Sequence, residues 1–340
     1  MAETVVVTGA TGFIAKHIIA ELLRRGYAVR GTVRKGASPL KVVTALNREG
    51  VDTAPLSFAA GDLTADESWD EAIQGADHLI HTASPFPMEQ PENPDDVILP
   101  AREGTLRVLR AAHRHGVRRV VLTSSTVAVM YPANYGPDHV FSETDFTDET
   151  APGLTPYIRS KTIAEKAAWN FVESTPGAPQ LTVINPGFVQ GPALDDDLST
   201  SLELYRLMAR GIYPAAPRIR FPVCDVRDVA AAHALSLAHP QAAGERFIVA
   251  RDDTGLFALG QALALECPDL KSKTPKFQLP DTAVRAMAVF DKRLRTILPE
   301  LGRVKAVTSE KVTSRLGLAL RPGEEAIRDA IRSLRAQGLV

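Results

Sequence analysis

The sequence predicts an α/β protein built on a doubly wound parallel sheet, with a smaller, mostly helical C-terminal lobe. Short apolar and β-branched runs alternate with helical patterns, which is the order that produces parallel sheets. The first of these runs ends in a glycine-rich turn that opens a helix. The chain has 340 residues, 45% of them hydrophobic, which is enough for a large core and an appended lobe.

The N-terminal element is a strand, a glycine turn and a helix. The β-branched run from Thr4 to Thr8 predicts a buried strand, and the turn covers Gly9 to Gly12. A helix follows from Phe13, and its start offers free N–H groups and a positive dipole end to a phosphate. The spacing is Gly-x-x-Gly-x-x-Ala, with Ala15 in the third position. An ordinary strand-to-helix turn is the alternative.

The residue after the second strand indicates which dinucleotide the turn holds. The strand over 28–33 ends at Arg34, and no acidic residue follows before Glu49. An acidic residue here binds the ribose hydroxyls of NAD, whereas an arginine accommodates the 2′-phosphate of NADP. Lys41, at the start of the next helix, is placed to reach the same phosphate. We therefore expect NADP(H) as the cofactor, with a solvated surface charge as the alternative role for Arg34.

The remaining elements follow the same alternation. We expect strands over 56–59, 78–81, 120–125, 181–184 and 246–249, and helices over 40–48, 69–73, 97–115, 157–174, 202–210, 230–237, 257–267 and 324–337. Residues 1–190 then form an NADP-binding domain of the Rossmann type, with a return segment of about 222–250. Residues 191–221 and 251–340 form the substrate lobe.

Two strand ends supply further candidates for the cofactor site. Asp62, after the third strand, is placed to accept from an adenine amino group, and a turn or N-cap role is equally open. The fourth strand ends in small residues, which suit a cofactor lying across the crevice: Thr82, Ala83 and Ser84. His78 and His81 lack a nearby thiol, and Asp195–Asp197 lacks calcium-loop spacing, so we expect no metal site at either place.

Tyr157 and Lys161 are the candidate reactive pair. They lie four residues apart at the start of a predicted helix, which puts their side chains one turn apart on one face. An ammonium beside a phenol stabilises the phenolate, so we expect the pKa of Tyr157 to be lowered from about 10. An amphipathic helix with a surface lysine is the alternative.

Composition excludes several classes of protein. The net charge is −1, from 39 basic and 40 acidic residues, which argues against nucleic acid as a partner. No apolar run is long enough to span a bilayer, and because the first strand is predicted from Thr4 we expect no signal peptide. Only two cysteines occur, so a disulfide framework is not expected, and Cys224 has no histidine placed to activate it. We expect a cytoplasmic monomer or homodimer that acts on a small molecule.

Six motifs stand in one order along the chain. They are Thr8 with Gly-x-x-Gly-x-x-Ala15, Arg34, Asp62-Leu63, Thr123-Ser124-Ser125, Tyr157-x-x-x-Lys161 and Asn185-Pro186-Gly187. Together they resemble the extended short-chain dehydrogenase/reductase family. Within it, the chain is similar to the branch of dihydroflavonol 4-reductase and of aldehyde and methylglyoxal reductases. The resemblance covers essentially the whole chain.

The resemblance implies an enzyme that reduces an aldehyde or ketone with NADPH. Tyr157 would be the general acid, and Lys161 would lower its pKa and hold the nicotinamide ribose. Ser125 would polarise the carbonyl oxygen, with Ser124 and Thr126 as alternatives. The implied cofactor contacts are Thr8, Gly9, Thr11, Gly12, Phe13, Ile14, Arg34, Lys41, Asp62, Leu63, Thr82, Ala83, Ser84, Thr123, Tyr157, Lys161, Pro186, Gly187 and Val189.

Several large side chains are candidates for an apolar substrate pocket, with ordinary core packing as the alternative. They are Phe86, Met130, Tyr131, Phe188, Tyr205 and Tyr213. Ala101 and Met130 stand where family members often carry asparagines, so a proton relay through the first and a dihydroflavonol substrate at the second are not expected. Thr155-Pro156 replaces the cinnamoyl-CoA reductase signature before Tyr157, which argues against a CoA thioester.

Two rival functions stay open. An NADP-binding regulatory or sensor protein would need the glycine turn but not the tyrosine, lysine and serine set. Another reaction of the scaffold, such as sugar-nucleotide epimerisation or 3β-hydroxysteroid oxidation, is the second rival. A sugar-nucleotide enzyme should carry a basic diphosphate site in the C-terminal lobe, for which the candidates are Arg206, Arg210, Arg218 and Arg220.

Overall fold

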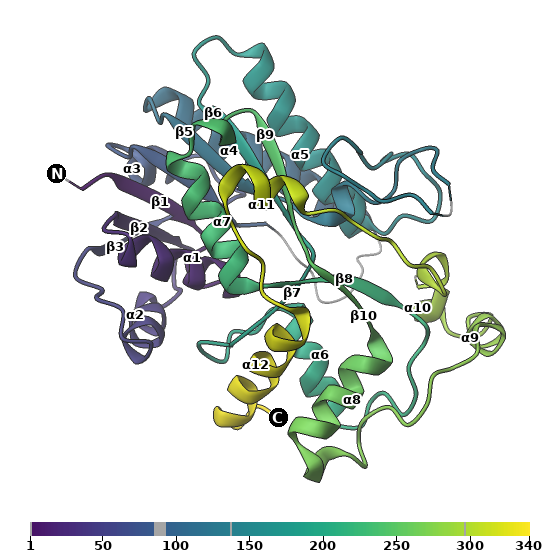
Figure 1. The fold of residues 1–340 in the computed structure, drawn as a ribbon. Coiled ribbons are helices and arrows are strands. Elements are labelled where there is room, and N and C mark those ends of the chain that lie inside the picture. The colour runs from purple at the N-terminus through teal and green to yellow at the C-terminus, as the bar shows by residue number, and fades with distance from the viewer. Residues whose placement is uncertain (1, 85–92, 137, 296) are drawn as a thin grey trace.

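A seven-stranded parallel sheet forms the centre of the protein in a computed structural model, which describes residues 2–84, 93–136, 138–295 and 297–340 (Figure 1). The strand order is β3-β2-β1-β4-β5-β6-β9, and every neighbouring pair is parallel. The strands are β1 (Thr4–Thr8), β2 (Ala28–Val33), β3 (Leu56–Ala60), β4 (His78–His81), β5 (Arg119–Thr123), β6 (Gln180–Pro186) and β9 (Glu245–Val249). This doubly wound order confirms the predicted fold class.

Alternate residues of the strands enter two hydrophobic cores, one on each face of the sheet. Val5 and Val7 pack in the core that includes α1 (Phe13–Arg24) and α7 (Val226–Ala238). Val6 packs in the core that includes α3 (Trp69–Ile73), α4 (Asp95–Arg114) and α5 (Pro156–Ser174). Because both faces are covered, the central strands β1 and β5 are near-continuous apolar runs, whereas the edge strand β3 has half-buried and exposed positions.

A second, three-stranded sheet, which was not predicted from the sequence, lies outside the main sheet. Its order is β10-β8-β7, formed by Asp252–Gly255, Arg220–Asp225 and Phe188–Gln190. These strands are three to six residues long, and β8 holds a proline, so their sequence signal is weak. After β8 the chain returns to the main sheet through α7 and β9, and β10 follows β9. The predicted domain boundaries stay a prediction.

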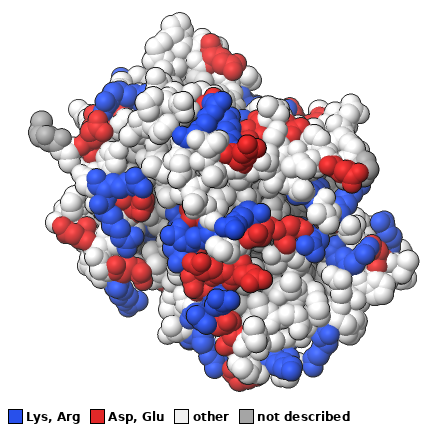
Figure 2. Space-filling view, in the orientation of Figure 1, with Lys and Arg blue, Asp and Glu red and all other residues white. Residues whose placement is uncertain are grey.

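The other elements lie around the two sheets (Figure 1). The helices are α2 (Pro39–Arg48), α6 (Thr200–Ala209), α8 (Leu256–Glu266), α9 (Asp281–Met287), α10 (Lys292–Arg295), α11 (Glu310–Leu316) and α12 (Gly323–Ala336). Helix α2 lies beside α1 at the main sheet, α11 lies beside α7 and β9, and α8 and α12 pack on the small sheet. Single 3₁₀ turns are η1 (Thr126–Ala128), η2 (Pro240–Ala242), η3 (Pro268–Leu270) and η4 (Leu298–Glu300). Within the described ranges, none of the helices has the length and apolar character needed to cross a bilayer. Basic and acidic side chains are interspersed on the face drawn in Figure 2.

Gly187 lies where the main sheet and the small sheet come closest. A Cβ atom built on this residue would lie 2.2 Å from the carbonyl oxygen of Pro222, so no larger residue fits without movement of the backbone. The Gly187 amide also donates to the carbonyl of Val249 at 3.0 Å. The residue therefore lets the end of β6 pass closely between β8 and β9.

Substituting Gly187 by alanine should destabilise the fold. Overpacking against a fixed carbonyl is expected to lower the free energy of unfolding by about 1–3 kcal/mol, measured by urea denaturation. Gly136→Ala is the matched control, because no atom lies within 4 Å of a Cβ built at Gly136. Equal stability of the two variants would contradict the steric argument.

Candidate active site

The glycine turn lies at the carboxyl edge of the sheet, against the end of β4. Gly9 has a φ of +67°, and a Cβ on it would lie 3.1 Å from the Cβ of Ala83. The Thr8 hydroxyl accepts hydrogen bonds from the amides of Thr82 and Ala83 at 3.1 and 3.0 Å. Helix α1 follows with Gly12 as an N-cap that supplies no side-chain bond, and its first turn carries no acidic residue. The turn therefore offers free amides and a positive helix end in a narrow space.

The candidate 2′-phosphate residues lie next to this turn. Arg34 is exposed at the end of β2. Lys41 is also exposed, and its ammonium nitrogen lies 3.3 Å from Asp196. Asp195, in the same loop as Asp196, pairs with the fully buried Lys16 of α1. The loop is therefore joined by ion pairs to both α1 and α2. The acidic residues Asp195 and Asp196 are thus paired, and Lys41 has an acidic neighbour that was not predicted from the sequence.

Asp62 and His81 have structural partners at the neighbouring strand ends. One Asp62 oxygen accepts from the amide and the hydroxyl of Thr64, at 2.8 and 2.7 Å, which is the turn role left open above. These hydrogen bonds are the main cause of the lowered pKa of Asp62. Nδ1 of His81 lies 2.8 Å from the Thr8 hydroxyl, and burial lowers the pKa of His81 to about 3, so the ring is neutral. Among the described residues, no group of three potential ligands is placed to hold a metal.

The predicted reactive pair lies at the start of α5, and local capping fixes that start. Thr155 is the N-cap, its hydroxyl accepts from the Ile158 amide at 3.3 Å, and Pro156 occupies the first turn. Tyr157 consequently lies in the first turn, half-buried, and its phenol is hydrogen-bonded by Ser125. Lys161 lies one turn later, with its ammonium 3.5 Å from the carbonyl oxygen of Thr123. The structure thus brings all three predicted residues together.

The two titratable groups of the pair are shifted in opposite directions. Burial raises the pKa of Tyr157, and the hydrogen bond from Ser125 opposes this rise. Burial lowers the pKa of Lys161 from 10.5 to about 8, and the carboxylate of Glu165 opposes that fall. The expectation that the Tyr157 pKa is lowered is therefore wrong for this structure, because loss of solvation outweighs the stabilisation of the phenolate.

The three hydroxyls at the end of β5 point to different partners. Thr123 is bonded to His233 at 2.7 Å, and Ser124 donates to Glu165 at 2.5 Å. Ser125 is the one of the serine pair that bonds the Tyr157 phenol. The resemblance implied Ser125, with Ser124 and Thr126 as alternatives, and the contacts favour Ser125 over Ser124 because the Ser124 hydroxyl is bonded to Glu165.

The candidate nicotinamide residues follow directly from β6. Pro186 ends β6, Gly187 makes the close approach described above, and Val189 lies in β7 with 9% of its surface exposed. These positions lie at the same carboxyl edge of the sheet as Ser125, since β5 and β6 are parallel neighbours. Their contact with a cofactor stays a prediction.

The candidate substrate residues separate into core and edge positions. Tyr205 is fully buried and donates to Gln190 at 2.7 Å, and Met130 is 5% exposed in a small core cluster. Tyr131 is half-buried, with its hydroxyl 2.9 Å from Glu300. Phe188 is half-buried and stacks on Phe221 with centroids 4.5 Å apart. Tyr213 is partly buried against the main core, and Phe86 lies outside the described residues.

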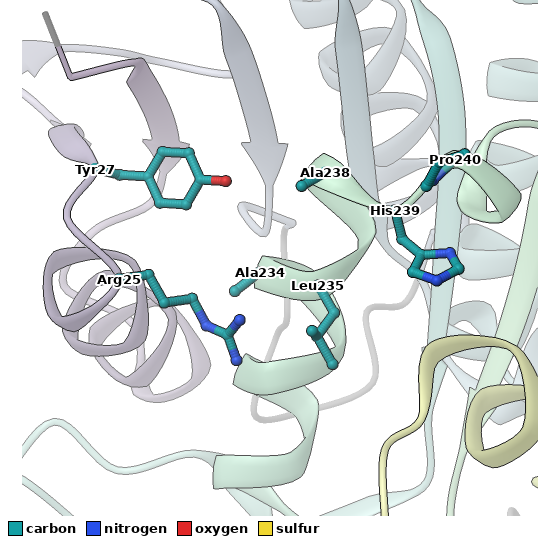
Figure 3. Close-up of a pocket in the computed structure, with 7 residues that line it drawn as sticks. All are labelled: Arg25, Tyr27, Ala234, Leu235, Ala238, His239 and Pro240. Atoms are coloured by element: carbon teal, nitrogen blue, oxygen red, sulfur yellow. The ribbon is translucent and has the colours of Figure 1, made fainter.

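A hollow of about 430 Å³ lies elsewhere on the protein, beside the C-terminal half of α7 (Figure 3). Arg25 and Tyr27 line one side of it, and Ala234 and Leu235 of α7 line the other (Figure 3). Tyr27 directly precedes β2, so the hollow lies at the amino edge of the sheet. The reactive residues lie at the carboxyl edge, and this hollow is not part of their site.

Sequence analysis did not single out Glu165. It lies one turn after Lys161, so Tyr157, Lys161 and Glu165 follow one another at four-residue spacing on one face of α5. Its main partner is Arg246 of β9, with Nε 2.6 Å from the carboxylate. The four-residue spacing was the available signal, whereas the partner was not visible in the sequence.

Comparison with known proteins places the chain in a family. The NAD dependent epimerase/dehydratase family matches residues 5–250. Ketoreductase azaE of Aspergillus niger is 35% identical over 86% of this chain and 90% of that protein. Cinnamoyl-CoA reductase CAD2 of Medicago truncatula is 34% identical over 98% of this chain and 96% of that protein.

Solved structures give the same result. Yeast methylglyoxal/isovaleraldehyde reductase Gre2, complexed with NADPH, has a TM-score of 0.78 and 26% identity, and the alignment covers 99% of this chain and 100% of that one. Gre2 of Candida albicans, also complexed with NADPH, has a TM-score of 0.80 and 28% identity, with 98% and 99% covered.

The lowered pKa of Lys161 can be measured directly. The rate of acetylation by acetic anhydride, followed by mass spectrometry of the peptide that contains Lys161, should reach half of its maximum near pH 8. An ordinary lysine titrates near about 10.4, so the difference is easily resolved. Heat-denatured protein is the control, and it should return the midpoint of Lys161 to the ordinary range. A folded midpoint in that range would contradict the desolvation described here.

Proposed function

The chain belongs to the NAD dependent epimerase/dehydratase family, and from this membership we propose that it reduces an aldehyde or ketone to an alcohol with NADPH. It is an oxidoreductase of the extended short-chain dehydrogenase/reductase family, in the branch of aldehyde and dihydroflavonol reductases. A Candida albicans protein named putative NADPH-dependent methylglyoxal reductase GRP2 is 30% identical over 80% of this chain and 85% of that protein. The observation that carries the proposal is the contact of Ser125 with Tyr157, one turn from Lys161.

The residues of the glycine turn fit a dinucleotide. Gly9, in its left-handed conformation against Ala83, leaves no room for a side chain and lets a pyrophosphate approach the backbone. The free amides at the start of α1 would bind its phosphates. Arg34 would bind the 2′-phosphate and supports NADP over NAD, and Lys41 would assist once it leaves Asp196. When bound, the reduced nicotinamide supplies a hydride to the carbonyl carbon.

The protein's own groups complete the reaction at the carbonyl oxygen. Ser125 would donate a hydrogen bond to this oxygen and polarise the carbonyl. The raised pKa of Tyr157 keeps its proton on the phenol at neutral pH, until negative charge grows on the substrate oxygen. The proton then passes from Tyr157 to that oxygen, and the Lys161 ammonium stabilises the phenolate that remains.

The rival functions are less well supported. Three of the four arginines suggested for a sugar-nucleotide diphosphate are held by acids: Arg206 by Glu203, Arg218 by Asp281 and Arg220 by Asp253. A regulatory NADP-binding protein would not need the contact between Ser125 and Tyr157.

Relatives named cinnamoyl-CoA reductase make a CoA thioester a substrate worth including in the assay panel. A cytoplasmic location, supported by two free, buried cysteines, and a monomeric or homodimeric state also belong to this proposal.

Replacing Tyr157 by phenylalanine should remove the proton donor and leave cofactor binding intact. We expect kcat for NADPH-dependent reduction of aldehydes and ketones to fall about 100- to 10,000-fold. NADPH binding, measured by fluorescence, should change little. Tyr27→Phe is the matched control, because that phenol lies at the amino edge of the sheet. Full activity of Tyr157→Phe would refute the assigned role.

Replacing Arg34 by alanine tests the choice of cofactor. Loss of a charge-assisted bond to the 2′-phosphate should raise the KM for NADPH about tenfold or more, with little effect on the KM for NADH. Arg48→Ala, an exposed arginine at the end of α2, is the control. An unchanged ratio of NADPH to NADH efficiency would show that Arg34 does not recognise the phosphate.

A further inference from the structure

A buried polar cluster lies directly beneath the candidate catalytic residues. Glu165 is 1% exposed, and one of its oxygens accepts from the Ser124 hydroxyl at 2.5 Å and from the Asn185 amide at 2.8 Å. The same Asn185 amide donates to the carbonyl of Ser125 at 3.1 Å. Glu165 therefore holds both neighbouring strand ends, β5 and β6, at the point where Ser125 leaves the sheet.

The other oxygen of Glu165 faces a buried cation. Arg246 of β9 donates to it from Nε at 2.6 Å, and the Trp169 indole donates at 3.4 Å. Arg246 also donates to the carbonyls of Glu143 and Asp145, at 2.9 and 2.7 Å. The ion pair thus connects α5 and β9 to the loop that follows η1. With both partners buried, loss of either charge leaves the other one uncompensated.

Glu165 also acts on Lys161 through space. The two residues are one turn apart on α5, and Glu165 is the one charge among the described residues that opposes the desolvation of Lys161. From β4, His81 faces Lys161 as a neutral ring, and from β9 Arg246 faces Glu165. Tyr157 lies one turn before Lys161 on the same helix. The positive charge of Arg246 therefore weakens the stabilising effect of the Glu165 carboxylate on the Lys161 ammonium but does not cancel it.

We propose that Glu165 is a positioning residue for the reaction, whose carboxylate orders the Ser124–Ser125 strand end and keeps Lys161 in its ammonium form. It does not touch substrate or cofactor, and it acts through Ser125 and Lys161. The inference rests on the proposed function for its consequence in catalysis. The effect of Glu165 on Lys161 itself can be measured without any turnover.

The test follows the acetylation midpoint of Lys161 in charge variants of the ion pair. Glu165→Gln should move the midpoint about one pH unit below that of the wild type, because the stabilising charge is gone. Arg246→Gln should move it upward, because the carboxylate is then unopposed. Ser124→Ala is the matched control, since it removes a hydrogen bond from the same oxygen without a change of charge, and its midpoint should stay at the wild-type value.

Catalysis should report the same shifts. At alkaline pH, kcat should fall as Lys161 loses its proton. This alkaline limb of the kcat profile should move to lower pH in Glu165→Gln and to higher pH in Arg246→Gln. A purely structural role would lower kcat equally at every pH. Circular dichroism shows whether Glu165→Gln is folded. If it is not, the Lys161 midpoint of the double variant Glu165→Gln/Arg246→Gln is compared with that of Arg246→Gln, because these two variants differ only in the charge of Glu165.

Two results would overturn the proposal. One is an unchanged Lys161 midpoint in every folded variant, and the other is a shift in Ser124→Ala as large as that in Glu165→Gln. If the Lys161 midpoints shift as expected but none of the carbonyl compounds tested supports NADPH oxidation, the proposed function is refuted. The action of Glu165 on Lys161 would still be established.

Discussion

The hydrogen bond between Ser125 and Tyr157 joins the end of β5 to the first turn of α5, and the rest of the site depends on it. Its geometry is fixed from both sides. Thr155 caps α5, and because a helix turns by about 100° per residue, a start one residue later would rotate Tyr157 away from Ser125. On the strand side, Glu165 and Asn185 hold Ser124 and the Ser125 carbonyl from below.

Loss of solvation gives this contact its chemical character. Burial favours the neutral form of both titratable groups, so Tyr157 keeps its proton and Lys161 is brought close to losing one. A protonated phenol suits a proton donor, whereas a neutral lysine would not stabilise the phenolate left behind. The buried carboxylate of Glu165 opposes the loss of the proton from Lys161. The site therefore balances a dry environment, which strengthens its hydrogen bonds, against the charge that Lys161 must keep.

The features predicted from the sequence are those encoded by local spacing. The parallel strands, the glycine turn and the pair Tyr157 and Lys161 each depend on residues close together in the chain. Features that depend on distant contacts were not predictable: the pairing of Lys41 with Asp196, the full burial of Tyr205, and the ion pair of Glu165 with Arg246, 81 residues apart. The small second sheet was missed because its strands are short. The pKa of Tyr157 was predicted in the wrong direction because spacing alone does not reveal desolvation.

The most direct test of this account is a crystal structure of the protein with NADP⁺ and a ketone substrate analogue. The account predicts that the carbonyl oxygen of the ligand lies within hydrogen-bond distance, about 2.6–3.2 Å, of both the Tyr157 phenol and the Ser125 hydroxyl. The carbonyl carbon should face the nicotinamide ring. A ligand whose oxygen bonds neither hydroxyl, in a crystal where the cofactor occupies the glycine turn, would contradict it.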